Sequence, residues 1–265
     1  MRAFCAVLGV VAATTLLAGC GDPTAPPASD GPAASGPPVR SATAELECEG
    51  PPYERGAGDY VDSGLERVGD DPASALEDLL EQNDPGLVPH DGYEEVRRVD
   101  DRVLLAYTVD GQVKAAFVAV DGVEDWDGGR GWGVDSWAVC DPAELPASVT
   151  DDWWIEVWTD KQAHRVPVTD VYSYDGSEHC DWQDIVFLTM GKETYLRDTE
   201  GELAAQTRGR FQGESRLPAD AASTGWRHDG RELWTVDSGD AAYLVSLDDP
   251  DDVESWPRAQ DFGCA

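Results

Sequence analysis

The residues that could perform chemistry are few and scattered in this sequence. Of four histidines, only His179 stands beside a cysteine, Cys180. A thiol and an imidazole can form a nucleophilic pair, but neighbours along the chain need not face each other, and Cys180 is also expected to form a disulfide. The chain carries no G-x-S-x-G, S-x-x-K or H-E-x-x-H motif, no phosphate loop and no dinucleotide fingerprint. We therefore assign no catalytic residue and no cofactor, and the sequence favours a protein without enzymatic activity.

Acidic residues crowd a glycine-rich stretch in the middle of the chain, where calcium is the metal to consider. Asp121, Asp125, Asp127 and Asp135 supply oxygens, and Asp125-x-Asp127 begins like an EF-hand loop, which has ligands at its first and third positions. Two glycines follow, however, and the loop lacks an acid at its fifth position and a glutamate at its twelfth. A solvated loop is the favoured interpretation, and no metal ligand is assigned.

Tryptophans give the clearest indication of binding. Trp153, Trp154 and Trp158 fall within one short stretch that we expect to be a strand, with Trp154 and Trp158 on one face and Trp153 on the other. Indole rings beside carboxylates suit sugars or cationic ligands, whereas packing in the core is the alternative. These three residues are the candidate ligand-binding residues, and we expect Trp153, or the pair Trp154 and Trp158, to be accessible to solvent.

The cysteines of the folded part are expected to form disulfides. Cys48, Cys140, Cys180 and Cys264 are four in number, and four cysteines allow three pairings. We favour Cys48–Cys140 and Cys180–Cys264, because each pair brackets one of two consecutive units. Each bridge would close a long loop, which contributes about 4–5 kcal/mol in the chain-entropy model. A zinc site is the alternative, but the closely spaced cysteine or histidine pairs that zinc sites need are absent.

The N-terminal segment indicates where the protein resides. Arg2 precedes Phe4 to Leu17, a stretch of apolar and small residues that is shorter than the about 20 residues of a membrane-spanning helix. Leu17-Ala18-Gly19-Cys20 resembles the lipobox of bacterial lipoproteins, which implies cleavage before Cys20 and attachment of a diacylglycerol to its thiol. The alternative is a plain secretory signal with an accidental cysteine. We expect residues 1–19 to be a signal peptide, and Cys20 to anchor the protein by its lipid to the extracytoplasmic face of the cell membrane.

The composition of the chain predicts a spacer after the anchor and an acidic surface. Residues 20–45 are dominated by Pro, Ala, Gly, Ser and Asp, so we expect a disordered, semi-extended spacer. The chain has 53 acidic and 19 basic residues and a formal net charge of -34. Such a surface repels phosphate backbones, which argues against nucleic-acid binding. General solubility would explain the acidity, and the more specific alternative is a cationic or basic partner.

Helix and strand patterns predict an α+β, β-rich fold of two small disulfide-stapled antiparallel-sheet units. In the first domain, residues 46–145, Asp71-Pro72 starts a helix whose apolar face carries Leu76, Leu79 and Leu80. Asp110-Gly111 lies between two strand-like runs and predicts a hairpin. The expected strands of this domain are 102–109, 112–120 and 132–140. Those of the second, β-rich domain, residues 150–265, are 153–159, 165–172, 185–190, 193–197, 232–236 and 241–247, with a loop at 217–225.

The two units also resemble each other. Ala115-Ala116-Phe117-Val118 matches Ala241-Ala242-Tyr243-Leu244, and Val123-Glu124-Asp125-Trp126 matches Val253-Glu254-Ser255-Trp256. These matches favour a diverged tandem repeat, whereas two unrelated small α+β units are the alternative.

The C-terminal half resembles exported lipoproteins of unknown function from high-GC Gram-positive bacteria. The resemblance covers roughly residues 153–265 and is carried by Glu178-His179-Cys180-Asp181-Trp182, by Thr224-Gly225-Trp226-Arg227 and by the ending Gly263-Cys264-Ala265. It implies an exported, disulfide-bonded domain and no catalytic residue. We therefore expect a membrane-anchored extracytoplasmic lipoprotein that binds a cell-surface protein or a wall glycan. The alternative is a hydrolase that uses paired carboxylates on a cell-envelope substrate.

Overall fold

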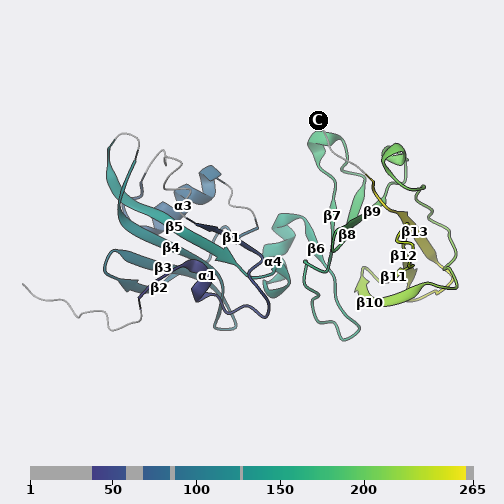
Figure 1. The fold of residues 1–265 in the computed structure, drawn as a ribbon, viewed down its shortest axis with the longest axis horizontal. Coiled ribbons are helices and arrows are strands. Elements are labelled where there is room, and N and C mark those ends of the chain that lie inside the picture. The colour runs from purple at the N-terminus through teal and green to yellow at the C-terminus, as the bar shows by residue number, and fades with distance from the viewer. Residues whose placement is uncertain (1–37, 58–67, 84–86, 126–127, 261–265) are drawn as a thin grey trace, which may run out of the picture. The chain divides into compact units, whose positions relative to one another are not determined.

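The described part of the chain is built on antiparallel sheets. The computed structural model describes residues 38–57, 68–83, 87–125 and 128–260 (Figure 1). One five-stranded sheet has the order β1-β5-β4-β3-β2, and two four-stranded sheets have the orders β6-β7-β8-β9 and β10-β11-β12-β13. The predicted β-rich, antiparallel architecture is confirmed. The predicted signal peptide, Cys20, Asp127, Cys264 and most of the predicted spacer lie outside the described residues.

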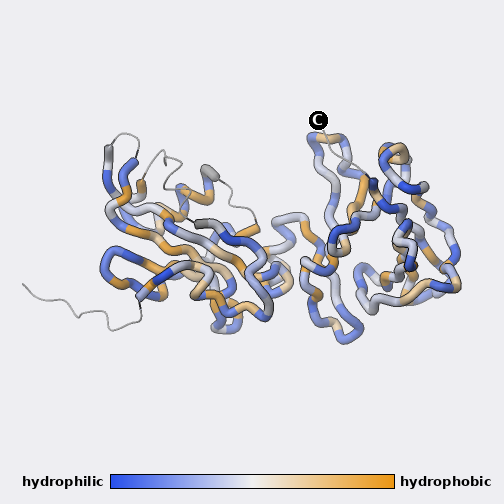
Figure 2. The backbone as a smooth tube through the Cα atoms, in the orientation of Figure 1, coloured by the Kyte–Doolittle hydropathy of each residue, from blue (hydrophilic) through white to orange (hydrophobic). Residues whose placement is uncertain are grey.

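The five-stranded sheet is apolar on both faces. Its strands are β1 (Glu54–Ala57), β2 (Glu94–Val99), β3 (Arg102–Val109), β4 (Gln112–Glu124) and β5 (Arg130–Val139). Since side chains alternate along a strand, Val103 and Leu105 enter one core cluster, while Leu104 enters a second one on the opposite face. Figure 2 shows hydrophobic stretches along these inner strands. Both faces therefore need a covering element.

Helix α3 (Pro72–Asn83) covers one face, as its sequence predicts. Leu76 and Leu79 are buried in the core beneath it, and Leu80 packs at its margin. Asp71 precedes the helix and accepts a hydrogen bond from the Ser74 backbone N–H at 2.9 Å, while the Ser74 hydroxyl accepts one from the Asp71 N–H at 3.0 Å. This reciprocal capping satisfies amide groups that have no partner inside the helix.

A short N-terminal segment covers the other face, and here the predicted spacer is wrong at its end. Val39 and Ala42 are buried against Leu104 and Ala116, with helix α1 (Ala42–Glu45) lying on the sheet. The Ala42 N–H donates to Ser136 Oγ at 3.1 Å. Residues 38–45 thus belong to the folded unit, because two small apolar side chains suffice where the sheet already offers a flat apolar face.

The C-terminal part folds into the two four-stranded sheets, which share a core. Trp158 and Leu188 from one sheet region pack with Leu233, Leu244 and Trp256 from the other. The strands are β6 (Ile155–Val157), β7 (Val171–Asp175), β8 (Val186–Met190), β9 (Glu193–Arg197), β10 (Ala222–His228), β11 (Arg231–Thr235), β12 (Ala241–Ser246) and β13 (Val253–Pro257).

Two predicted strands of this part are wrong. The expected strand 153–159 is reduced to β6, because Trp153 ends a 3-10 turn (Asp151–Trp153) and Trp154 has the left-handed φ of 60°. The expected strand 165–172 is mostly loop, and only its last two residues enter β7. The expected loop 217–225 extends into β10, which begins at Ala222.

One predicted disulfide is confirmed. Cys48 and Cys140 are bonded, with their Cα atoms 5.3 Å apart. Cys180 is disulfide-bonded as well, but its predicted partner Cys264 lies outside the described residues. Among the described residues, no helix is long and apolar enough to cross a membrane.

The structure does not show the tandem repeat. The matched segments occupy different positions in the sheets, since Val123 and Glu124 end the long strand β4, whereas Val253 and Glu254 begin the separate strand β13.

Candidate functional site

The three candidate tryptophans do not form a common face. Trp154 is 73% exposed, whereas Trp158 is 1% exposed and belongs to the core of the C-terminal part. Trp153 is partly buried and packs against the core of the five-stranded sheet. The predicted pairing of Trp154 with Trp158 is therefore wrong, because the left-handed residue at 154 breaks the strand alternation. Trp154 is the one of the three that projects into solvent.

The acidic loop does not assemble a metal site among its described residues. Asp125 Oδ1 accepts the Gly129 N–H at 2.7 Å, and Asp121 Oδ1 accepts the Gly122 N–H at 2.7 Å. Asp135 forms an ion pair with Arg102 at 2.6 Å. Asp127 lies outside the described residues.

One other group of potential metal ligands exists in the described part of the chain, but two of its members are bonded to each other. It consists of Cys48, Cys140 and Glu144, whose ligand atoms lie close together. The two sulfur atoms form a disulfide, so they are not available as thiolate ligands.

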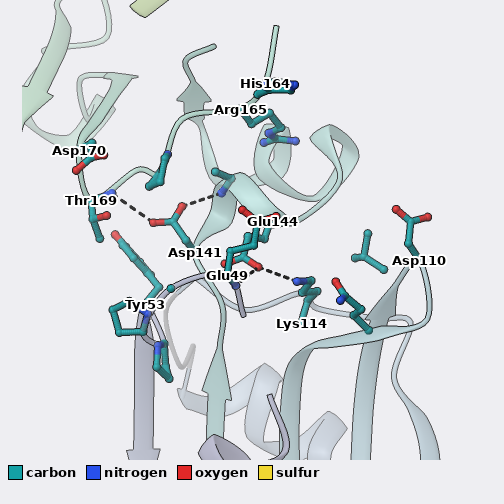
Figure 3. A pocket seen from close by; sticks show the side chains of 17 residues that line it. Glu49, Tyr53, Asp110, Lys114, Asp141, Glu144, His164, Arg165, Thr169 and Asp170 are labelled. Carbon is teal, nitrogen blue, oxygen red and sulfur yellow. Dashed lines mark hydrogen bonds and ion pairs between the residues drawn. The ribbon is translucent and has the colours of Figure 1, made fainter. Parts of the chain in front are cut away.

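A cavity with a volume of about 780 Å³ lies around Lys114. We call it the Lys114 cavity (Figure 3). Four segments line it: the stretch from Glu49 to Tyr53 before β1, the β3–β4 turn with Asp110, the turn that carries Asp141 to Glu144, and the loop from His164 to Asp170. Its charged side chains divide into two sets, one bound within the protein and one open.

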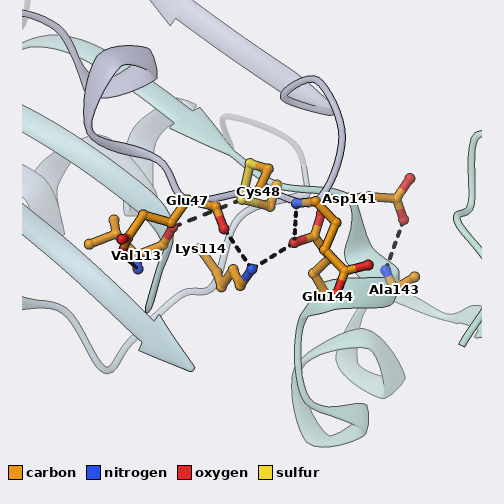
Figure 4. The surroundings of a disulfide bond; sticks show 9 residues. Glu47, Cys48, Val113, Lys114, Asp141, Ala143 and Glu144 are labelled. Carbon is orange, nitrogen blue, oxygen red and sulfur yellow. Dashed lines mark hydrogen bonds and ion pairs between the residues drawn. A yellow bond between two sulfur atoms is a disulfide. The ribbon is translucent and has the colours of Figure 1, made fainter. Parts of the chain in front are cut away.

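The bound set begins with a buried ion pair. Lys114 Nζ lies 2.7 Å from Glu144 Oε2, and the two side chains are only 6% and 10% exposed (Figure 4). Lys114 also donates to the Glu47 carbonyl at 2.7 Å, and the Glu49 N–H donates to Glu144 Oε2 at 3.0 Å. The pair therefore fastens the segment around the disulfide to the turn that follows β5. Full use of their hydrogen-bonding capacity is what a buried pair needs to offset its desolvation.

Asp141 is the second bound group. It is buried, and its Oδ1 accepts the N–H groups of Ala143 and Val168, both at 2.9 Å, while its Oδ2 accepts that of Thr169 at 3.4 Å. The same carboxylate thus caps the 3-10 turn Pro142–Glu144 and holds the loop before β7. Its lone pairs serve the protein backbone, so Asp141 is a structural residue of the cavity wall.

Arg165 is also held by the protein. Its guanidinium donates to the Leu145 carbonyl at 2.7 Å and to Thr150 Oγ1 at 3.0 Å. Burial lowers the pKa of Arg165, and the neighbouring carboxylates of Asp151 and Asp141 counteract that shift.

The open set is acidic. Glu49, Asp110 and Asp170 are exposed at the cavity, and their carboxylates take part in no hydrogen bond or ion pair with the residues that the structure describes. Tyr53 stands beside them, and burial, helped by Tyr172, Glu54 and Asp141, raises its pKa to about 12. The Tyr53 hydroxyl is therefore a protonated donor at neutral pH. The open groups of the cavity include these carboxylates, one phenol and the proline rings of Pro51 and Pro52.

A second polar cavity, of about 240 Å³, lies between β6–β9 and β10–β13. A chain of hydrogen bonds crosses it: Trp158 Nε1 donates to Ser173 Oγ at 3.1 Å, and Ser173 donates to Glu156 Oε2 at 2.7 Å. His228 Nε2 lies 3.1 Å from the same carboxylate oxygen. The hydrogen bond from His228, and then that from Ser173, lowers the pKa of Glu156.

This second cavity is poorly suited to hydrolysis by paired carboxylates. Such enzymes need one carboxyl group that stays protonated near neutral pH. Glu156 is held ionised, and Glu254 on the other side accepts from Trp256 Nε1 at 2.8 Å and pairs with Arg231 at 3.6 Å. The Ser173 hydroxyl donates to a carboxylate rather than to the histidine, so it is not activated as a nucleophile.

Cys180 is disulfide-bonded, so it offers no thiolate, and His179 contacts the Ser177 hydroxyl at the surface.

Sequence reasoning missed the residues that build both cavities. Lys114 offers the one clear signal, since it stands among the apolar residues of β4 and must therefore be buried and paired. Asp141, Glu144 and Glu156 carry no local pattern that separates them from the many exposed acids.

Comparison with protein-family models, with characterised protein sequences and with solved structures finds no match to this chain.

Proposed function

We propose that this protein is a lipid-anchored, non-enzymatic binding module on the extracytoplasmic face of a bacterial membrane, and that it binds a basic segment of a cell-surface protein. The binding site is the Lys114 cavity. The lipobox-like ending at Cys20 and the proline-containing stretch after it support the anchoring part of the proposal.

A single observation carries the binding part: the cavity separates its charges. Internal hydrogen bonds and ion pairs engage the side chains of Lys114, Glu144 and Asp141. The charged groups that stay open are all negative, namely the carboxylates of Glu49, Asp110 and Asp170. Carboxylates grouped at a concave surface attract Lys and Arg side chains and raise the association rate of a basic partner. Tyr53 and the adjacent prolines add apolar contact area for the stems of those side chains.

Hydrolysis by paired carboxylates receives less support. Asp141 and Glu144 of the Lys114 cavity are engaged in internal hydrogen bonds, and the hydrogen bond from His228 lowers the pKa of Glu156 in the smaller cavity.

The test uses an oligolysine peptide as the probe and a triple variant, Glu49→Gln, Asp110→Asn and Asp170→Asn. Exposed ion pairs contribute about 0.5 kcal/mol each, so the variant should bind the peptide about tenfold more weakly at low salt. Wild-type binding should weaken as salt rises. Isothermal titration calorimetry at low and high salt measures both effects.

A matched triple variant, Glu214→Gln, Asp220→Asn and Asp248→Asn, removes the same charge from exposed positions outside the cavity. It should retain most of the affinity. Equal loss in both variants would mean that net charge alone attracts the peptide, and the cavity would not be the site. Binding of wall-glycan fragments that resists high salt would replace the basic protein by a glycan as the ligand.

A further inference from the structure

The two four-stranded sheets of the C-terminal part join each other along both edges. Thr159, just beyond β6, exchanges backbone hydrogen bonds with Arg227 of β10, at 2.9 and 2.7 Å. On the other side, Tyr195 of β9 forms an antiparallel bridge with Arg258, which follows β13. The strands β6 to β13 therefore surround a common interior, and the ends of such closed sheets are frequent ligand sites.

Strand alternation points two oppositely charged side chains into this interior. Arg197 follows Tyr195 by two residues on β9, and Tyr195 belongs to the shared core, so both lie on the inner face. Glu156 on β6 lies directly opposite Ser173, which is 1% exposed, and accepts a hydrogen bond from it. Arg197 and Glu156 both line the second cavity, which measures about 240 Å³. Pockets for drug-sized ligands measure about 300–1,000 Å³, so a ligand of this cavity must be small.

Two other charged side chains that line the cavity are already paired with neighbours. Arg231 donates to both carboxylate oxygens of Asp252, at 3.2 and 3.0 Å. Glu254 accepts from the Trp256 indole N–H at 2.8 Å and lies 3.6 Å from Arg231. Asp229 lies in the turn between β10 and β11 and is exposed at the rim. The charges of Arg231 and Glu254 therefore offset each other within the protein.

Glu156 keeps one carboxylate oxygen open. Ser173 and His228 both contact its Oε2, at 2.7 and 3.1 Å, whereas its Oε1 has no partner among the residues that the structure describes. The hydrogen bond from His228 lowers the pKa of Glu156, so the carboxylate is negative at neutral pH. This oxygen can accept a hydrogen bond from a cationic group in the cavity.

Arg197 is the open cation. Its guanidinium donates no hydrogen bond within the described part of the chain: Nε lies 3.8 Å from Glu254 Oε2, and the guanidinium carbon lies 5.7 Å from the centre of the Phe211 ring. Arg197 and Glu156 line the same cavity without forming an ion pair with each other. A small molecule that carries an ammonium and a carboxylate group would pair with both. We propose that the second cavity binds a small zwitterion of the amino-acid class, with its ammonium group at Glu156 and its carboxylate at Arg197.

Three probes of similar shape separate the two charges. L-valine carries both, L-valinamide carries only the ammonium group, and N-acetyl-L-valine carries only the carboxylate. The apolar side chains of Val186 and Leu244 in the cavity wall suit the isopropyl group that all three share. Wild-type protein should bind valine about tenfold more tightly than either derivative, because each derivative leaves one charged group of the cavity without its partner.

Indole N–H signals in the NMR spectrum report on binding. Trp158 and Trp256 line the cavity, and their indole N–H groups donate to side chains that line it as well, so both are reporters. Trp137 lies in the core of the five-stranded sheet, and its signal should not shift. The full mature chain is used with Cys20→Ser, so that no detergent is needed.

Glu156→Gln and Arg197→Gln should each weaken valine binding about tenfold. Glu156→Gln should not weaken binding of N-acetylvaline, which has no ammonium group, and Arg197→Gln should not weaken binding of valinamide, which has no carboxylate. Glu214→Gln and Arg208→Gln are the matched controls, since they remove the same charges from exposed positions outside the cavity. Neither control should change the affinity for valine.

The proposal is overturned if valine shifts neither reporter up to its solubility limit. It is equally overturned if a singly charged derivative binds as tightly as valine, or if either cavity variant, folded by the same spectrum, retains the wild-type affinity. Where one variant does not fold, the other variant and the comparison of the three probes decide. Neither reporter lines the Lys114 cavity, so the outcome is independent of the proposed function.

Discussion

At the scale of single residues, the buried charges decide which acids are structural. Most acidic residues in the described part of the chain are surface groups, but Asp141 is buried and the Glu144 side chain is nearly so, and both hold backbone segments together. Removing one member of a buried pair leaves the other charged and desolvated, whereas removing an exposed group changes little. The change in the free energy of unfolding on mutation therefore distinguishes buried, structural acids from exposed ones, which the composition does not.

We expect Glu144→Gln to lower the free energy of unfolding by about 3–5 kcal/mol, because Lys114 would lose its charged partner in a buried position. Glu124→Gln removes the partner of Arg130 from an exposed pair and is the matched control, with an expected change below about 0.5 kcal/mol. Urea unfolding followed by tryptophan fluorescence measures both. Similar small changes in the two variants would mean that the Lys114–Glu144 pair is open to solvent.

At the scale of elements, one face of the five-stranded sheet is covered by residues 38–45. The sequence of this segment gives little indication that it packs there. Ala42 is buried on the inner side of α1, and Ala44 is exposed on the same helix. The same substitution at each alanine therefore compares the buried face of α1 with its exposed face.

Ala42→Asp should destabilise the protein by about 2 kcal/mol or more, since it places an unpaired carboxylate against Leu104 and Ala116. Ala44→Asp should change the free energy of unfolding by less than about 0.5 kcal/mol. Thermal unfolding followed by circular dichroism compares them. Equal melting temperatures would show that residues 38–45 do not pack on the sheet in solution.

Local patterns predicted the elements whose signals are self-contained. Asp71-Pro72 and the leucine spacing predicted α3, and Asp110-Gly111 predicted the β3–β4 hairpin, because caps and turns depend on neighbouring residues alone. The strand through Trp153 and Trp158 failed because a left-handed residue interrupts it, which no alternation reveals. The packing of Val39 and Ala42 was missed since it depends on a sheet face formed by distant residues.

The candidate site was less predictable than the fold for the same reason. Asp141 acquires its role from groups that lie far away in the sequence, such as Val168. Only Lys114 is marked locally, by its position among apolar strand residues.

At the scale of the whole molecule, the proposed lipid anchor determines where the protein acts. We expect mass spectrometry of the mature wild-type protein to find acyl chains on Cys20, and Cys20→Ser to release the protein from the membrane fraction, because two lipid chains supply the stable attachment. Absence of acyl chains from the wild-type protein would contradict the lipobox interpretation and leave a secreted protein.

The disulfide between Cys48 and Cys140 has a mechanical consequence for a protein tethered in this way. A pull from the membrane would enter the fold through residues 38–47 and would first detach α1 from the sheet, where non-covalent contacts carry the load. At Cys48 the tension passes through a covalent bond to Cys140, which lies 92 positions further along the chain, so the residues between them are shielded from extension. The five-stranded sheet would therefore keep its shape under a force that peels away the segment in front of it.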